Sequence, residues 1–242
     1  MLRRPILCVP RSDALRIAAR HLTDAGLPIT HKAAPDVSHV LLPVPSFTTG
    51  DSYLAHLLTD LPEDAVFSGG FLDTPLLQGR QTVDFLKDPY YLAENAAITA
   101  SCAIRMLDHA ALKGSRVLIV GWGRIGKCLC RLLDAEGAEL SVAVRKDADR
   151  AIIRALGWRG ISIEDARQEL YHYDVLLNTV PQMVLPDINT KSGAVILELA
   201  SKPGMSGTNI IDARGLPGKM APEASGKLIA NTFIRLSLRK ER

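Results

Sequence analysis

The sequence lacks the patterns that would place the protein in a membrane, in an oxidising compartment or on nucleic acid. Its first apolar run, Ile6 to Val9, covers four residues, too few for a secretory signal or a membrane span. Its four cysteines form no CxxC pair and no zinc-finger spacing, and Cys128 and Cys130 lie on different sides of a helical pattern. We therefore expect a cytoplasmic protein with reduced, buried cysteines and no metal site.

The chain also has no large excess of positive or negative charge. The net charge is +3 and the only dense basic run is RLSLRKER at residues 235–242, so we expect no nucleic-acid or membrane partner. No repeat or low-complexity tract is present. With 242 residues, 47% hydrophobic and 23% charged, the chain has the composition of a folded protein of two small domains or one large one.

Apolar, strand-like runs alternate with helical patterns along the whole chain. The predicted strands are 6–9, 37–44, 65–67, 117–120, 140–144, 175–177 and 194–199. The predicted helices are 11–25, 52–58, 90–112, 125–136, 150–156 and 222–238. This alternation predicts an α/β protein with two lobes, each a doubly wound parallel sheet of the flavodoxin or Rossmann type, joined by long helices.

The position of the glycine-rich strand, about halfway along the chain, indicates which lobe comes first. We predict a substrate or partner lobe at residues 1–95, a linking helix at 96–112 and a nucleotide lobe at 113–221. The C-terminal helix, 222–242, is expected to pack back on the first lobe. Because ligands of two-lobed α/β enzymes favour the cleft between the lobes, the first lobe would hold the substrate.

The best-supported chemistry is a dinucleotide-binding turn in VLIVGWGRIG, residues 117–126. Gly121 would permit the tight turn, Gly123 would let the backbone approach a pyrophosphate, and Gly126 would allow close helix packing. The predicted cofactor residues of this turn are Gly121, Trp122, Gly123, Arg124, Ile125 and Gly126. The alternative is a structural turn in a Rossmann-like lobe that binds no cofactor.

The end of the next strand favours NADP over NAD. An NAD enzyme usually has a carboxylate there for the adenosine ribose, whereas this chain has Arg145 followed by Lys146. A guanidinium can bind a 2′-phosphate with paired hydrogen bonds. NAD stays open, since Asp147 or Asp149 could serve a ribose in a shifted register, and Arg145 could be an ordinary exposed charge.

Two further strand ends should meet the same crevice, because ligands of open α/β sheets lie beyond the carboxyl ends of the strands. They are DVLLNTVP and LELASKPG. The cofactor-binding residues predicted from them are Asn178, Thr179, Val180, Pro181, Leu199 and Ala200.

In this order, GWGRIG, DVLLNTVP, LELASKPG and GLPGKMAPEASGKLIAN resemble the A subunits of dipicolinate synthase from spore-forming bacteria. HVLLPVPSFTTG and VFSGG extend the resemblance into the first lobe, so it covers most of the chain. It implies a relative of the D-2-hydroxy acid dehydrogenases. The implied reaction is nicotinamide-linked oxidation of a dihydrodipicolinate-type dicarboxylate, from the hydroxytetrahydrodipicolinate branch of lysine biosynthesis, to pyridine-2,6-dicarboxylate. The implied setting is the mother-cell cytoplasm during sporulation, and the implied partner is a flavoprotein-like B subunit; a homodimer is a further option.

The chain departs from that family at two places. Where the family usually has T-x-E-G, this chain has Thr99, Ala100, Ser101 and Cys102, so a carboxylate that could transfer a proton is absent. After SKPG the chain reaches GLPG early, with Asn209 in place of an aspartate. An element of the nucleotide lobe is therefore expected to be trimmed.

Candidate substrate and catalytic residues come from three segments. Lys202 could pair with a substrate carboxylate or polarise the ring nitrogen, or could simply cap its loop. Hydroxyls or amides near Ser46, Thr48 and Thr49 could bind the second carboxylate, or form a plain strand-to-helix connection. The remaining candidates, on the linking helix, are Asn95 for substrate binding and Thr99 and Ser101 for catalysis, with Asn95 and Thr99 on one face.

Two rival functions stay in view. A D-2-hydroxy acid dehydrogenase would need a general acid-base histidine near the C-terminus, but Glu223 occupies that place and the last histidine is His172. A nucleotide-sensing or subunit-docking module with little catalysis would need only the glycine turn and the basic ribose site.

Overall fold

The computed structural model describes residues 4–46 and 52–238, and its contacts divide the chain into two compact units. Unit 1 comprises Met1–Asn95 and Met220–Arg242, and unit 2 comprises Ala96–Lys219. Among the described residues, no helix is long and apolar enough to cross a membrane.

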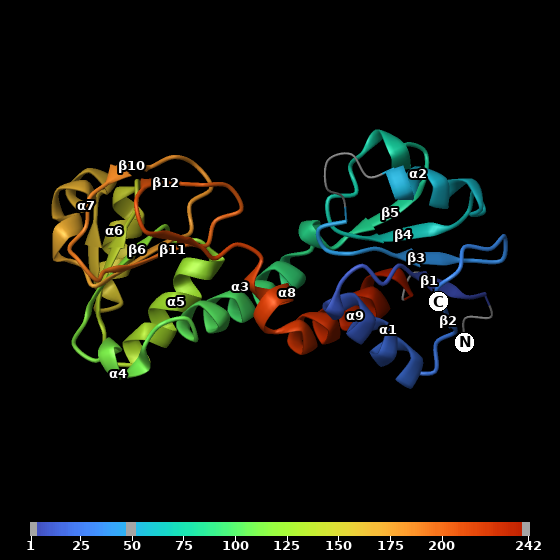
Figure 1. The fold of residues 1–242 in the computed structure, drawn as a ribbon, viewed down its shortest axis with the longest axis horizontal. Helices are drawn as coiled ribbons and strands as arrows, with labels where there is room; N and C mark the ends of the chain where they lie inside the picture. Colours follow the sequence, from blue (N-terminus) through green and yellow to red (C-terminus); the bar gives the residue numbers. More distant parts are fainter. Residues whose placement is uncertain (1–3, 47–51, 239–242) are drawn as a thin grey trace. The chain divides into compact units, whose positions relative to one another are not determined.

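Unit 1 contains a five-stranded parallel sheet in the order β2-β1-β3-β4-β5, the flavodoxin-like doubly wound order. Its strands are β1 (Ile6–Cys8), β2 (Ile29–Thr30), β3 (His39–Leu41), β4 (Val66–Gly69) and β5 (Gln81–Asp84). Its helices are α1 (Asp13–Asp24), α2 (Ser52–Thr59), α9 (Pro222–Ser237) and the first part of α3 (Pro89–Ile104). α1 and α9 lie side by side on one face of the sheet, and α2 lies on the other (Figure 1).

The C-terminal helix α9 packs against α1 at very short range because of a glycine. A Cβ on Gly226 would lie 2.6 Å from the Ala14 carbonyl oxygen and 2.7 Å from the Ile17 Cβ. At the start of the same helix, Glu223 accepts a hydrogen bond from Arg20 at 3.0 Å and lies 3.3 Å from the His21 ring. A segment from the end of the chain thus completes the N-terminal unit.

We expect Gly226→Ala to lower the free energy of unfolding by about 2 kcal/mol, since overpacking a tight contact costs more than the helix propensity that alanine restores. Urea unfolding measures this loss. Lys227→Ala, at the exposed neighbouring position, is the control and should change stability little. A Gly226→Ala protein as stable as the wild type would contradict the close packing of α1 and α9.

The start of α3 is fixed to α9 by Asp88. Its carboxylate accepts a hydrogen bond from the Tyr91 amide at 2.7 Å and two from the Arg235 guanidinium. The hydrogen bonds from Arg235 hold the pKa of Asp88 below its usual value. The same guanidinium lies over the Tyr90 ring, 4.9 Å from its centroid.

Unit 2 contains a six-stranded parallel sheet in the order β13-β11-β9-β6-β7-β8, the Rossmann order. Its strands are β6 (Arg116–Val120), β7 (Glu139–Ala143), β8 (Arg159–Ile161), β9 (Val175–Asn178), β11 (Val195–Glu198) and β13 (Ile210–Asp212). A separate pair joins β10 (Leu185–Ile188) to β12 (Met205–Gly207). The helices are α4 (His109–Leu112), α5 (Arg124–Ala135), α6 (Asp147–Ala155), α7 (Ile163–Glu169) and α8 (Leu216–Met220).

Two doubly wound parallel sheets confirm the fold class predicted from the sequence. All seven predicted strands are present. The strands that the prediction missed are β2, β5, β8, β10, β12 and β13. Most of these are edge strands or short, with partly exposed residues, so they lack the continuous apolar run that marks a strand buried on both faces.

The prediction of a single helix over residues 90–112 is wrong. α3 ends at Ile104, a turn follows, and α4 begins at His109. The apolar spacing continues through this turn because Leu107 is buried there, so periodicity alone gave no sign of the break.

The connection from β11 to β13 is the segment where the sequence predicted a trimmed element. These parallel neighbours are joined by residues 199–209, which contain β12 and no helix. The edge strand is nevertheless present and paired in register, with Ile196 opposite Ile210. The sheet therefore has its sixth strand, and the connection to it contains no helix.

Candidate functional site

The glycine turn between β6 and α5 has the geometry that its spacing predicted. Gly121 has φ +105°, and a Cβ on it would lie 2.5 Å from the Thr179 hydroxyl. A Cβ on Gly126 would lie 2.3 Å from the Gly121 carbonyl oxygen. Both positions therefore require glycine for the strand, the turn and the helix to approach one another.

Gly123 has a different reason to be glycine. It is the N-cap of α5, with ordinary extended backbone, and a Cβ there would meet no atom within 4 Å. Nothing among the described residues excludes a side chain at this position. The first amides of α5 have no intrahelical partner, and with the helix dipole they attract an anion. Open space beside an anion-binding helix end fits a bound pyrophosphate.

A pocket in unit 2 continues from this turn. It is lined by Gly121, Trp122, Ala143, Val144, Arg145, Lys146, Asp149, Ile163, Val180 and Val184. The Trp122 indole is positioned by an edge contact with Trp158, at 5.9 Å between ring centroids, and by the Lys127 ammonium at 5.5 Å. Apolar walls with cations at one end suit an adenosine that carries a phosphate.

The cationic end of this pocket lies where β7 ends. Arg145 and Lys146 are exposed there, and Arg150 holds the turn by donating to the carbonyl oxygens of Val144 (3.3 Å) and Arg145 (3.2 Å). Asp147 pairs with Arg150, so its carboxylate is already engaged. Asp149 lines the same pocket, and a carboxylate there is the feature that favours NAD.

The loops after β9 and β11 are joined by a buried carboxylate that no sequence motif had singled out. Glu198, 4% exposed, accepts hydrogen bonds from the Asn178 amide at 2.8 and 3.0 Å. It also accepts from the backbone amides of Ala200 (3.0 Å) and Gly204 (2.8 Å). The sequence signal for this network was the one charged residue in the apolar run VILELA. A buried carboxylate needs hydrogen-bond donors around it, so a charge at that position indicates such partners.

Asn178 connects Glu198 to Val180, which lines the pocket. Its side chain is fully buried, donates to the Val180 carbonyl oxygen and accepts from the Val180 amide, both at 3.0 Å. Thr179 donates through its hydroxyl to the Val120 carbonyl oxygen at 2.9 Å. Asn178 and Thr179 thus position Val180 and the glycine turn, and their predicted part in cofactor binding stays a prediction.

The other residues predicted to bind the cofactor differ in how much of each side chain is exposed to solvent. Arg124 and Pro181 are exposed, Ile125 is half-buried, and Leu199 and Ala200 are buried at the end of β11. Lys202 is exposed in the loop that Glu198 holds. Among the described residues, no group of three or more His, Cys, Asp or Glu side chains is placed to bind a metal ion.

The predicted substrate residues are only partly described. Thr48 and Thr49 lie outside the described residues. Ser46 is buried, and its hydroxyl donates to the Pro43 carbonyl oxygen at 2.7 Å and accepts from the Gly70 amide at 3.0 Å, so its role is structural. On α3, Asn95 is half-buried, Thr99 is buried and Ser101 is exposed.

Cys8 and Cys130 are buried, and Glu223 is paired with side chains of α1. Burial raises the pKa of the Cys8 and Cys130 thiols to about 12, so both stay protonated and behave as small apolar side chains. Glu223 is engaged in the Arg20 and His21 contacts between α9 and α1.

A flavodoxin-like unit and a Rossmann unit with a dinucleotide-type turn define the fold of the NAD(P)-binding dehydrogenases. Comparison with solved structures agrees: a transhydrogenase from Sinorhizobium meliloti matches with TM-score 0.71 and 14% identity, over 92% of this chain and 80% of that one. The crystal structure of the A subunit of dipicolinate synthase from Bacillus halodurans matches with TM-score 0.80 and 23% identity, over 96% of each chain.

The sequence comparison identifies the relative more closely. The A subunit of dipicolinate synthase from Bacillus subtilis (strain 168) is 28% identical over an alignment of 232 residues, gaps included, that covers 83% of this chain and 77% of that protein. No protein-family model matches the chain. The chain is therefore similar to the dipicolinate synthase A subunits in sequence and in fold.

Proposed function

We propose that the protein is an NADP-linked oxidoreductase that converts a dihydrodipicolinate-type dicarboxylate to pyridine-2,6-dicarboxylate. The observation that carries the proposal is its similarity to the A subunit of dipicolinate synthase over most of both sequences. The pocket beside the glycine turn supports it independently. We further propose that a flavoprotein-like B subunit is its partner, and that it acts in the mother-cell cytoplasm of a sporulating bacterium.

The reaction removes a hydride and a proton from a partly reduced ring, and aromatisation provides the driving force. When bound, the nicotinamide would supply the hydride acceptor. The residues of this chain would bind and orient the reactants: the first amides of α5 for the pyrophosphate, Arg145 and Lys146 for the 2′-phosphate, and Val180 for the apolar wall. Lys202 is the proposed partner of a substrate carboxylate, and Thr99 and Ser101 are candidates near the reacting ring.

Arg145→Ser should weaken NADPH binding about tenfold and leave NADH binding unchanged, because a charge-assisted hydrogen bond to the 2′-phosphate is worth about 1.5–3 kcal/mol. Calorimetric titration with each nucleotide measures both affinities. Arg154→Ser removes an exposed arginine of α6 that does not line the pocket, and it should bind both nucleotides as the wild type does. If Arg145→Ser weakened the binding of NADPH and of NADH equally, Arg145 would not contact the 2′-phosphate, and Asp149 would be favoured as the ligand of the ribose.

The reaction itself is tested by supplying freshly generated hydroxytetrahydrodipicolinate with NADP⁺ and following the ultraviolet absorption of dipicolinate and of NADPH. The assay is run with the protein alone and together with the B subunit from the same organism. Dipicolinate formed in equal amount with NADPH supports the proposal. Dipicolinate formed at the same rate without the protein would contradict it.

A non-catalytic, nucleotide-sensing or subunit-docking module is the second candidate. It is favoured by the replacement of the glutamate of the family's T-x-E-G motif by Ser101, which is exposed. This candidate predicts NADPH binding without turnover in the same assay, with the B subunit present. Turnover by the wild-type protein in that assay would contradict this candidate.

A further inference from the structure

Phe71, in unit 1, combines two properties that are uncommon for a large apolar residue. Its φ is +59°, in the left-handed region that a bulky side chain rarely adopts, and its side chain is 61% exposed. Neither property stabilises a folded protein: the backbone is strained, and a large apolar ring remains in water. A residue with both properties needs a reason outside the stability of the fold.

The neighbours of Phe71 impose this conformation. On one side, the Gly70 amide donates to the Ser46 hydroxyl at 3.0 Å, and the Ser46 amide donates to the Gly70 carbonyl oxygen at 2.8 Å. On the other side, the Leu72 amide donates to the Asp84 carboxylate at 3.2 Å while the Leu72 side chain is buried. The chain is fixed before and after Phe71, so the ring is held outward.

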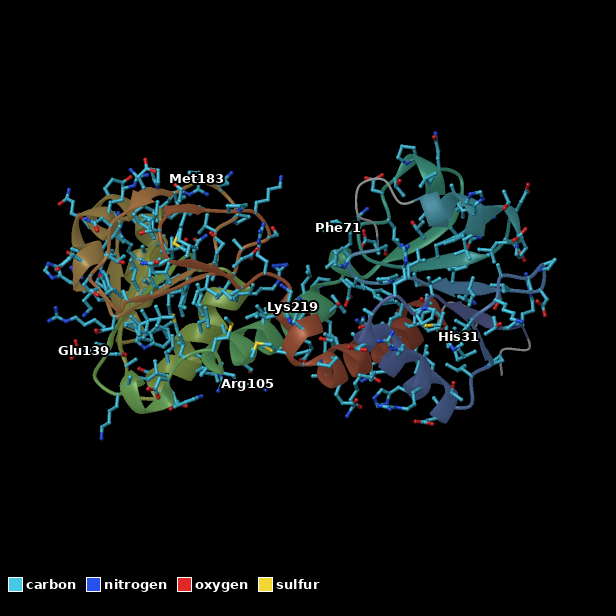
Figure 2. The ribbon with its side chains drawn as sticks, in the orientation of Figure 1. His31, Phe71, Arg105, Glu139, Met183 and Lys219 are labelled. Carbon is cyan, nitrogen blue, oxygen red and sulfur yellow. The ribbon has the colours of Figure 1, made fainter. Side chains whose placement is uncertain are left out.

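Phe71 lies at the edge of the sheet where α/β proteins bind ligands. Phe71 follows β4 by two residues, at the carboxyl end of a parallel sheet. Figure 2 shows Phe71 at the surface of unit 1. A strained and exposed aromatic ring at this edge has the features of a ligand contact.

We infer that Phe71 is a substrate-binding residue whose ring stacks on a flat, conjugated or aromatic carboxylate. The inference rests on the proposed function, which supplies a ring of this kind. Two carboxylates withdraw electrons from a pyridine ring, and an electron-poor ring stacks favourably on the electron-rich face of phenylalanine. The contact strengthens as the ring becomes planar, so Phe71 would favour the aromatic product-like state over the puckered substrate.

Three variants separate the ring from the backbone strain. Phe71→Tyr keeps the ring. Phe71→Ala removes the ring and keeps the strain, and Phe71→Gly removes both, because glycine adopts φ +59° freely. Dipicolinate binding is measured by calorimetry at saturating NADPH, and the Tm is measured for each variant. Leu76→Ala is the control, since Leu76 is another exposed apolar residue of unit 1.

We expect dipicolinate binding about three- to tenfold weaker in Phe71→Ala and Phe71→Gly, and unchanged in Phe71→Tyr and Leu76→Ala. NADPH binding should be the same in all of them. Phe71→Gly should melt about 3 °C above Phe71→Ala, the reverse of the usual order for these residues, because it releases the strain.

Wild-type affinity for dipicolinate in both Phe71→Ala and Phe71→Gly would overturn the inference while the proposed function stands. Failure of the wild-type protein to bind dipicolinate at all would overturn both. Loss of affinity in Phe71→Tyr as great as in Phe71→Ala would also overturn it, since the stacking face is then not what matters.

Discussion

Gly123→Ala is expected to weaken NADPH binding about a hundredfold without changing the free energy of unfolding, because the added methyl group occupies the path of the pyrophosphate to the backbone. The backbone of Gly123 is extended, and a Cβ there meets no protein atom within 4 Å, so the folded protein tolerates the change. Calorimetric titration and urea unfolding measure the two quantities separately.

A matched control exists in the same unit. A Cβ on Gly218, in α8, also meets no atom within 4 Å, and Gly218 does not line the pocket beside the glycine turn. Gly218→Ala should therefore be as stable as the wild type and bind NADPH normally. If Gly123→Ala bound NADPH with wild-type affinity, the open space beside α5 would not be a pyrophosphate site.

Asn178→Asp is expected to destabilise unit 2 by about 4 kcal/mol, because it places a second carboxylate against Glu198 where both are buried. It also replaces the amide that donates to Glu198 and to the Val180 carbonyl oxygen. The Val180 wall then loses its support, and NADPH binding should weaken in the protein that remains folded.

The pH dependence identifies the cause. Repulsion between two buried carboxylates raises the pKa of the pair in the folded variant above its unfolded value. Stability is then lost as the pH rises through this range, so the deficit should shrink at acidic pH. Glu169→Gln, which breaks a half-exposed pair with Arg159, is the control and should cost about 1 kcal/mol at most. An Asn178→Asp protein as stable as this control would contradict the buried network.

The sequence predicted the parts of the fold whose residues must satisfy a strict local pattern. The three glycines of the turn fall at the spacing that strand, turn and helix impose, and each has a contact or an open space that accounts for it. The central strands β6 and β9 are buried on both faces, which gives continuous apolar runs. These features could be found without knowing the tertiary structure.

The parts that could not be predicted depend on contacts between distant segments. Glu198 stands out in the sequence only as a charge inside an apolar run. Two of its four hydrogen bonds come from Asn178, at the end of the neighbouring strand β9, which tertiary folding brings beside it. The other two come from amides of the loop that follows Glu198. Ser46 was predicted to contact substrate because its hydroxyl follows a strand, but the Gly70 amide uses that hydroxyl. The positive φ of Phe71 has no sequence signal, since phenylalanine does not usually adopt it.

Calorimetric titration of the purified protein with NADPH, first alone and then in the presence of dipicolinate, tests the proposed function most directly. We expect micromolar NADPH binding, weaker NADH binding, and tighter NADPH binding when dipicolinate is present. NADPH binding that ignores dipicolinate would favour the nucleotide-sensing module. No binding of either nucleotide would contradict the assignment of the glycine turn itself.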